Sequence, residues 1–309
     1  MDKLLHQPIM VSEVLQALKI DPDGIYIDAT FGRGGHTSAI LSAVKSTARV
    51  YGLDKDPAAI AAGQLLSKNH PQFSIHHTSF ANIQDFCNHH ALLGKVSGIL
   101  LDLGVSSPQL DDAARGFSFR HNGPLDMRMN PTQGMSAAIW INQAPEAEII
   151  EILKVYGEER YAKRIGKAIY AAIRIKPLTT TDELSAIVSK AHPAWEKHKH
   201  PATRSFQAIR IFINQELQEL QQGLEGCLEI LKPGGRMAIL SFHSLEDRIV
   251  KRFIQKHTQK DKHAVGLPIA NAHFTSRLSK IGKKITPSLE EIRDNPRARS
   301  AVMRVAQKE

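Results

Sequence analysis

The sequence has few of the groups that would indicate a metal centre, a disulfide framework or a membrane segment. Its only two cysteines, Cys87 and Cys227, are far apart and form no CxxC pair, which disfavours a disulfide-rich or zinc-binding domain. Fifteen histidines form no HExxH pattern, and we expect no bound metal. No apolar run approaches transmembrane length, and the first residues lack the features of a signal peptide. These absences predict a cytoplasmic protein that does not act at a membrane.

Negative charge is scarce in the C-terminal part of the chain. The formal net charge of the 309 residues is +9, yet residues 248–309 contain fifteen Lys and Arg against five Asp and Glu, while the preceding residues together carry −1. Such a tail predicts a polyanionic partner, because neutralising phosphates drives affinity for nucleic acid. A solvated basic surface without a partner is the alternative. The oligomeric state cannot be inferred from this pattern.

Strand and helix patterns alternate through the first hundred residues. Apolar segments predict strands at residues 25–28, 49–53, 73–77 and 96–103, and amphipathic segments between them predict helices at residues 37–44, 58–68 and 83–93. Strands separated by helices are typical of a doubly wound, mainly parallel α/β sheet. Ligands of such sheets bind outside the carboxyl ends of the strands.

The alternation stops after residue 110. Residues 111–145 show no sustained period, and helices are expected at residues 146–156, 160–175 and 182–191, the last with Thr180 and Glu183 spaced as a capping box. We therefore predict a discontinuous core domain of residues 1–110 and 201–309. Residues 111–200 are predicted to form an inserted helical domain that contributes to substrate recognition.

The α/β pattern resumes with what reads as one long helix. Its apolar positions recur at three- and four-residue steps, at Phe206, Ile209, Ile213, Leu217, Leu220, Leu224, Cys227 and Leu231. Pro233-Gly234-Gly235 is expected to end this helix. A strand at residues 236–242, a helix at 245–256 and a strand at 301–305 are expected to follow.

A glycine-rich loop follows the first predicted strand, in Tyr26-Ile-Asp-Ala-Thr-Phe-Gly-Arg-Gly-Gly-His-Thr37. Such loops hold nucleotide-like cofactors in α/β folds. Asp54 ends the second strand 22 residues after Gly32, where a carboxylate reaches a ribose diol. NAD and S-adenosylmethionine both present that diol, but the run lacks the third glycine of GxGxxG. Together with Phe80, which is placed to lie against an adenine, this favours S-adenosylmethionine over a dinucleotide.

A second motif, Leu101-Asp-Leu-Gly-Val-Ser-Ser-Pro-Gln-Leu110, follows the fourth predicted strand. A tight turn is one explanation for its glycine, serines and proline. Asp102, however, ends a buried strand, where a carboxylate needs a hydrogen-bonding partner or a ligand.

Five segments, taken in order, resemble the family of ribosomal RNA small-subunit methyltransferases H, also called MraW. They are Asp28-Ala-Thr-Phe-Gly-Arg-Gly-Gly-His36, Leu101-Asp-Leu-Gly-Val-Ser-Ser-Pro-Gln109, Arg204-Ser-Phe-Gln-Ala-Ile-Arg210, Leu231-Lys-Pro-Gly-Gly235 and Ser241-Phe-His-Ser-Leu-Glu-Asp-Arg248. The resemblance implies a Rossmann-like class I methyltransferase core with a helical insertion. It also implies S-adenosylmethionine-dependent methylation of a cytosine N4 amine in 16S rRNA, at the decoding centre of the small ribosomal subunit.

The resemblance also implies the site residues. Cofactor contacts are expected from Gly34, Gly35, His36, Asp54, Phe80, Asp102 and Gln109. The residue types and positions suggest Asp102 and Ser106 as catalytic residues and Arg204 and His243 as contacts to the substrate. Lys280, Lys283, Lys284, Arg297 and Arg299 in the tail are candidates for RNA phosphate contacts. Methylation of another RNA or of a non-RNA substrate stays open on the residues alone, and an NAD-dependent oxidoreductase is less favoured.

Overall fold

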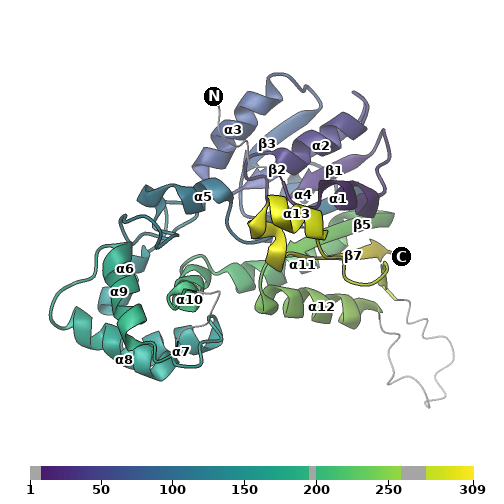
Figure 1. Ribbon diagram of the computed structural model, residues 1–309. Coiled ribbons are helices and arrows are strands. Elements are labelled where there is room, and N and C mark those ends of the chain that lie inside the picture. The colour runs from purple at the N-terminus through teal and green to yellow at the C-terminus, as the bar shows by residue number, and fades with distance from the viewer. Residues whose placement is uncertain (1–7, 195–199, 259–275) are drawn as a thin grey trace, which may run out of the picture. The chain divides into compact units, whose positions relative to one another are not determined.

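The computed structural model describes residues 8–194, 200–258 and 276–309, which belong to two compact units (Figure 1). The core unit consists of the chain up to Gly104 together with residues 217–309, and the helical unit consists of residues 105–216. The sequence placed the corresponding boundaries after residues 110 and 200. Each unit is described by itself below.

A seven-stranded sheet organises the core unit, in the order β3-β2-β1-β4-β5-β7-β6. Its strands are β1 (Ile25–Asp28), β2 (Arg49–Asp54), β3 (Phe73–His77), β4 (Val96–Asp102), β5 (Leu231–Ser241), β6 (Leu278–Lys280) and β7 (Val302–Lys308). Strands β1 to β5 are parallel, whereas β7 runs antiparallel to both β5 and β6. The predicted doubly wound, mainly parallel α/β fold is confirmed. The strand order reverses between β1 and β4, which is where such folds bind their ligands.

Each face of this sheet has its own hydrophobic core, because successive side chains of a strand point to opposite faces. In β4, Ile99 and Leu101 pack on one face and Leu100 packs on the other. Helices α4 (Ile83–His89), α11 (Glu216–Ile230) and α12 (Ser244–Thr258) contribute to the first core. Helices α1 (Val11–Leu18), α2 (Gly35–Ala43) and α3 (Pro57–Ser67) contribute to the second. The central strands are therefore buried on both sides, and their carboxyl ends provide the polar edge.

Two sequence expectations about residues 203–242 were wrong. The expected single helix is two helices, α10 (Thr203–Ile213) and α11, because Gln215 adopts a left-handed conformation with φ 52° and interrupts the helix. The three- and four-residue spacing of apolar side chains continues across this break, so the sequence pattern does not reveal it. Strand β5 already begins at Leu231, and its pairing with β4 jumps from Val96–Leu231 to Gly98–Arg236. The Pro-Gly-Gly sequence is thus an irregularity within β5 rather than a connection before it.

Several short elements were not expected at all. The structure adds α1 at the start of the core unit, α6 (Ala137–Gln143) in the helical unit, and β6 and α13 (Leu289–Asp294) in the C-terminal part. Each is eight residues or shorter, so the sequence shows too few periods to reveal it.

The helical unit packs α6, α7 (Glu146–Val155), α8 (Ala162–Ile173), α9 (Thr181–Ala191) and α10 around one hydrophobic core. Thr180 and Glu183 form the capping box expected at the start of α9. None of the helices in the described part of the chain is long and apolar enough to span a membrane.

Asn214, directly after α10, connects that helix to an irregular loop of the helical unit. Its side-chain carbonyl accepts a hydrogen bond from the Met129 N–H at 2.7 Å, and its amide donates to the Met127 carbonyl at 2.7 Å and to the Arg210 carbonyl at 2.9 Å. Asn214 is buried, so no solvent replaces these bonds if the side chain is removed.

We predict that Asn214→Ala lowers the free energy of unfolding of the helical unit by about 2–6 kcal/mol, since two buried backbone groups each lose a partner at about 1–3 kcal/mol. Trp140 is buried in α6 of this unit, so its fluorescence in urea reports on the unfolding of the unit. Gln222→Ala on an exposed face of α11 is the control and should change stability by less than about 0.5 kcal/mol. If the two variants unfold at the same urea concentration, the stabilising role assigned to Asn214 is wrong.

Candidate functional site

The glycine-rich loop connects the carboxyl end of β1 to the start of α2. The Phe31 N–H donates to the Leu53 carbonyl at 3.0 Å, and the Gly34 N–H donates to the Phe31 carbonyl at 2.8 Å. Gly34 has φ +76°, and a Cβ at this position would lie 2.6 Å from the Phe31 ring. Both the backbone conformation and the packing therefore require glycine here. The result is a tight loop at the switch point of the sheet.

Asp54, at the carboxyl end of β2, anchors this loop. One carboxylate oxygen accepts a hydrogen bond from the Gly32 N–H at 2.7 Å, and the other accepts one from the Asp56 N–H at 2.8 Å. Burial raises the pKa of Asp54 to about 6, although these two hydrogen bonds act in the opposite direction. The Asp54 carboxylate therefore lies beside the glycine loop, and its ionised form is less favoured than that of an ordinary aspartate.

Two further acidic residues, Asp28 and Asp102, end β1 and β4. Asp28 is fully buried, its carboxylate accepts a hydrogen bond from the Thr37 hydroxyl at 2.7 Å, and burial raises its pKa. The Nε2 atom of His36, in the first turn of α2, lies 3.6 Å from an Asp102 carboxylate oxygen. Burial lowers the pKa of His36, but the hydrogen-bonding and charge effects of Asp102, together with the charge of Asp28, outweigh it and the net pKa is raised. The structure therefore brings together His36 and Asp102, two of the predicted cofactor residues.

Asp102 and His36 present polar atoms that lack partners. The Oδ1 atom of Asp102 and the Nδ1 atom of His36 are buried and make no hydrogen bond to any described residue, and His36 Nε2 has only its 3.6 Å ion pair with the other Asp102 oxygen. The backbone of Asp102 is nevertheless fixed, because its N–H donates to the Thr30 hydroxyl at 2.6 Å. Buried polar atoms without partners are rare in native proteins and indicate a ligand or water. A ligand with an ammonium or hydroxyl donor, such as S-adenosylmethionine, fits the Asp102 oxygen as acceptor.

Phe80 lies just beyond β3, in a single turn of 3₁₀ helix from Phe80 to Asn82 that Ser79 caps. One side of its ring packs closely against α11, where a Cβ at Gly223 would lie 2.5 Å from the ring. Phe80 is half-buried and packs against the core that contains α4 and α11. The Phe80 ring is therefore positioned by α11, which lies more than a hundred residues later in the sequence.

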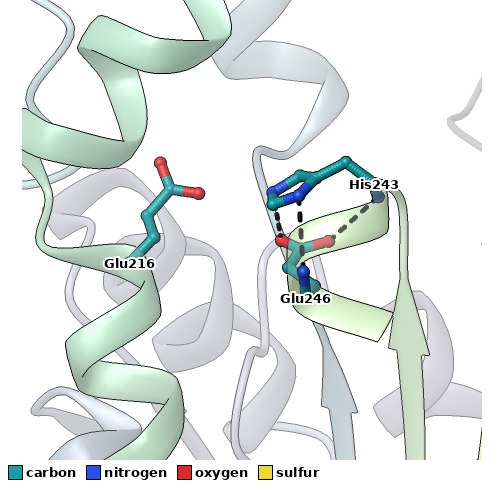
Figure 2. Close-up of side chains that lie close together, drawn as sticks. All are labelled: Glu216, His243 and Glu246. Atoms are coloured by element: carbon teal, nitrogen blue, oxygen red, sulfur yellow. Dashed lines mark hydrogen bonds and ion pairs between the residues drawn. The ribbon is translucent and has the colours of Figure 1, made fainter. Parts of the chain in front are cut away.

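His243 follows β5 and is engaged by Glu246 in the first turn of α12 (Figure 2). The Nε2 atom of His243 lies 3.1 Å from one oxygen of Glu246, while the other oxygen accepts hydrogen bonds from the N–H groups of Phe242 and His243 at 2.8 and 3.2 Å. Glu246 is buried, so this arrangement fixes the turn from β5 into α12. The role of His243 toward substrate stays a prediction.

The remaining predicted residues belong to the helical unit. Ser106 is the N-cap of α5 (Ser107–Asp111) and forms a capping box with Gln109, whose side-chain carbonyl accepts the Ser106 N–H at 2.9 Å. Arg204 lies in the first turn of α10, and its guanidinium donates to the Glu158 carbonyl at 3.5 Å. Thus Gln109 orients the loop after β4 from a buried position, whatever else it contacts.

Four residues near this site were not among the predicted site residues. Asp28 could have been identified from the sequence, because it ends a predicted strand as Asp54 and Asp102 do. Thr30 and Thr37, which hold Asp102 and Asp28, show no pattern in sequence. Glu291, whose charge contributes to the raised pKa of His36, comes from α13 at the far end of the chain. Only the fold brings it there.

We predict that Asp102→Asn lowers the pKa of His36 from its raised value, because burial then acts with less opposition. The measurement is an NMR titration of the His36 ring, with Asp23→Asn, an exposed carboxylate, as the control. The folded protein binds the His36 proton more tightly than the unfolded chain does, so protonation of His36 stabilises the fold. This contribution to the free energy of unfolding is complete below pH 6.5 and is lost as the pH rises through the folded-state pKa. An unchanged titration in Asp102→Asn would contradict the coupling.

Comparison with known proteins identifies the family of this chain. Residues 3–309 match the MraW methylase family. The chain is 53% identical over 305 residues to "Ribosomal RNA small subunit methyltransferase H" of Nitrosococcus oceani, covering 98% of this chain and 97% of that protein. It is 52% identical over 304 residues to the protein of the same name from Chromohalobacter salexigens, covering 98% and 91%.

A crystal structure of an rRNA methylase from Streptococcus thermophilus aligns with 99% of this chain and 98% of its own at a TM-score of 0.42 and 12% identity. The family assignment rests on the sequence matches, which extend over nearly the whole chain. This chain belongs to the MraW methylase family and is an S-adenosylmethionine-dependent methyltransferase.

Proposed function

We propose that this protein methylates the N4 amine of a cytosine in the 16S rRNA of the small ribosomal subunit. The observation that carries the proposal is the unpartnered, buried Oδ1 atom of Asp102 at the carboxyl end of β4, beside the switch point of the sheet. The two relatives named above are methyltransferases of small-subunit ribosomal RNA. Such a substrate places the protein in the cytoplasm, in contact with the subunit.

The residues that would hold the cofactor come from β2, the turn after β3, the start of α2, the end of β4, and α5. Asp54 would accept hydrogen bonds from the ribose, Phe80 would pack against the adenine, and the loop at Gly34 and Gly35 would bring the backbone close to the ligand. His36, Asp102 and Gln109 would complete the contacts. When bound, S-adenosylmethionine supplies an electrophilic methyl group on a sulfonium.

The target amine sets the demands on the protein's own residues. The N4 lone pair of cytosine is delocalised into the ring, so the nitrogen has to be aligned and its protons have to be accepted. Alignment of reacting groups is worth about 7–11 kcal/mol. Asp102 supplies a carboxylate acceptor on a fixed backbone, and Ser106 supplies a hydroxyl and carbonyl four positions later in the chain. We assign to these two residues the orientation of the amine and the acceptance of its protons.

The substrate would be recognised as structured RNA with one base unstacked. A base inside a stack cannot reach a pocket at the edge of a sheet, so the cytosine has to be splayed or flipped out. Arg204 and His243 are the proposed contacts to the RNA in addition to the basic C-terminal segment. Lysine and arginine contacts to phosphates would make the affinity fall steeply with salt.

We predict that cofactor affinity falls in acid because protonated Asp54 cannot accept both ribose hydroxyl donors. With a pKa of about 6, Asp54 is almost fully ionised above pH 7, and its ionised fraction falls about tenfold by pH 5. The Kd for S-adenosylmethionine should therefore rise about tenfold between pH 7.5 and pH 5. Calorimetry measures this, and Asp54→Asn should bind more weakly with a flatter pH profile. Equal pH dependence of the two proteins would show that another group is responsible.

The catalytic assignment predicts that Asp102→Asn lowers the turnover number for methyl transfer by about 10²–10⁴, the range for a lost proton acceptor. Ser106→Ala should lower it about tenfold, as expected for one hydrogen bond. Ser106→Asn is the control for helix capping, because asparagine is also a favoured N-cap residue while a carboxamide replaces the hydroxyl. Cofactor binding is measured separately for each variant. Full turnover in both serine variants would exclude a role for the hydroxyl.

A further inference from the structure

A hollow of about 90 Å³ opens on the core unit between α12, the loop after β6, and β7. Its apolar floor contains Ile254, Ile281 and Val305. Five basic residues line it, namely Lys251, Lys280, Lys283, Lys284 and Arg304. None of these belongs to the candidate cofactor or catalytic residues. We call this feature the lysine pocket.

Backbone hydrogen bonds fix the loop that carries two of the lysines. Before it, the Ile281 N–H donates to the Val305 carbonyl at 3.0 Å, and after it, Ile285 and Met303 exchange hydrogen bonds at 2.9 and 2.8 Å. Lys283 and Lys284 are thus presented from a segment attached to β7 at both ends. Lys280 is held by the pairing of β6 with β7, and Lys251 by α12. The four charges therefore come from positions that are ordered without a ligand.

The charge in this pocket is largely uncompensated. Arg304 is neutralised by Asp247, whose two carboxylate oxygens lie 2.6 and 2.9 Å from the guanidinium nitrogens. The four lysines form no ion pair with any carboxylate in the described parts of the chain. Lysines on edge strands protect against edge-to-edge pairing, and this explains Lys280 on β6. It does not explain Lys251, which reaches the same hollow from a helix.

We propose that the lysine pocket binds the phosphodiester backbone of the substrate RNA at a position separate from the flipped base. The inference rests on the proposed function and narrows the RNA contacts of its basic C-terminal segment to one pocket, which Lys251 of α12 completes. Ammonium groups bind phosphate as point charges, and four of them around a small hollow suit one or two neighbouring phosphates. The apolar floor suits the ribose between them. Because the lysines recognise the backbone, the pocket contributes affinity and orientation rather than sequence specificity.

The test compares Lys283→Gln/Lys284→Gln with Lys45→Gln/Lys68→Gln, a control with the same change in charge at exposed positions of the core unit. Binding of a fluorescent 16S rRNA fragment is measured by anisotropy between 50 and 300 mM salt, and thermal unfolding verifies that each variant is folded. Each lost phosphate contact lowers the slope of log K against log salt by about 0.7–0.9. The pocket variant should therefore show a slope smaller by about 1.4–1.8 and weaker binding at low salt, and the control should match the unmodified protein.

A pocket variant that binds the rRNA fragment with the affinity and salt slope of the unmodified protein overturns the inference. So does an equal loss in the control, because that would reflect net charge alone. A methyl-transfer assay of the unmodified protein distinguishes failure of the lysine-pocket proposal from failure of the proposed function. If the unmodified protein transfers methyl groups to rRNA and the pocket variant binds RNA normally, only the lysine pocket is wrong. If it transfers none, the proposed function itself fails.

Discussion

The need to satisfy three carboxylates at the carboxyl edge of one sheet governs this structure. Asp28, Asp54 and Asp102 end neighbouring parallel strands at this edge, Asp28 buried and the other two half-buried. Thr37 satisfies Asp28, and the backbone of the glycine loop satisfies Asp54. Asp102 alone retains a buried oxygen without a partner among the described residues. The site is thus prepared for a donor that the core unit does not supply.

The rest of the core unit maintains this edge. Hydrophobic cores on both faces support the strands, and the strand order reverses between β1 and β4, where Asp28 and Asp102 end and where such sheets bind ligands. Helix α11 supports Phe80 through the absence of a side chain at Gly223, and α13 brings the charge of Glu291 to His36. Segments far apart in sequence therefore determine the electrostatics of a loop near the N-terminus.

Much of the fold could be predicted from sequence, because the strands β1 and β3 are short apolar segments bounded by clear turn and helix signals, and their predicted limits agree with the structure. The break between α10 and α11 could not, since the apolar period continues through Gln215 and only the backbone conformation reveals it. The strand-end carboxylates were evident from sequence, but the contact between His36 and Asp102 depends on the register of β1 against β4. Thr30 and Glu291 act through tertiary contacts alone, and no local pattern distinguishes them from other residues of their kind.

The most direct test of the central claim is the identity of the methylated group. The protein is incubated with small ribosomal subunits and S-adenosylmethionine labelled in its methyl group, and the rRNA is then digested to nucleosides and analysed by chromatography and mass spectrometry. The account predicts that the label appears in N4-methylcytidine from 16S rRNA, and that Asp102→Asn lowers its rate of appearance by about 10²–10⁴ while folding is preserved. Label in another nucleoside, or in ribosomal protein only, would contradict it.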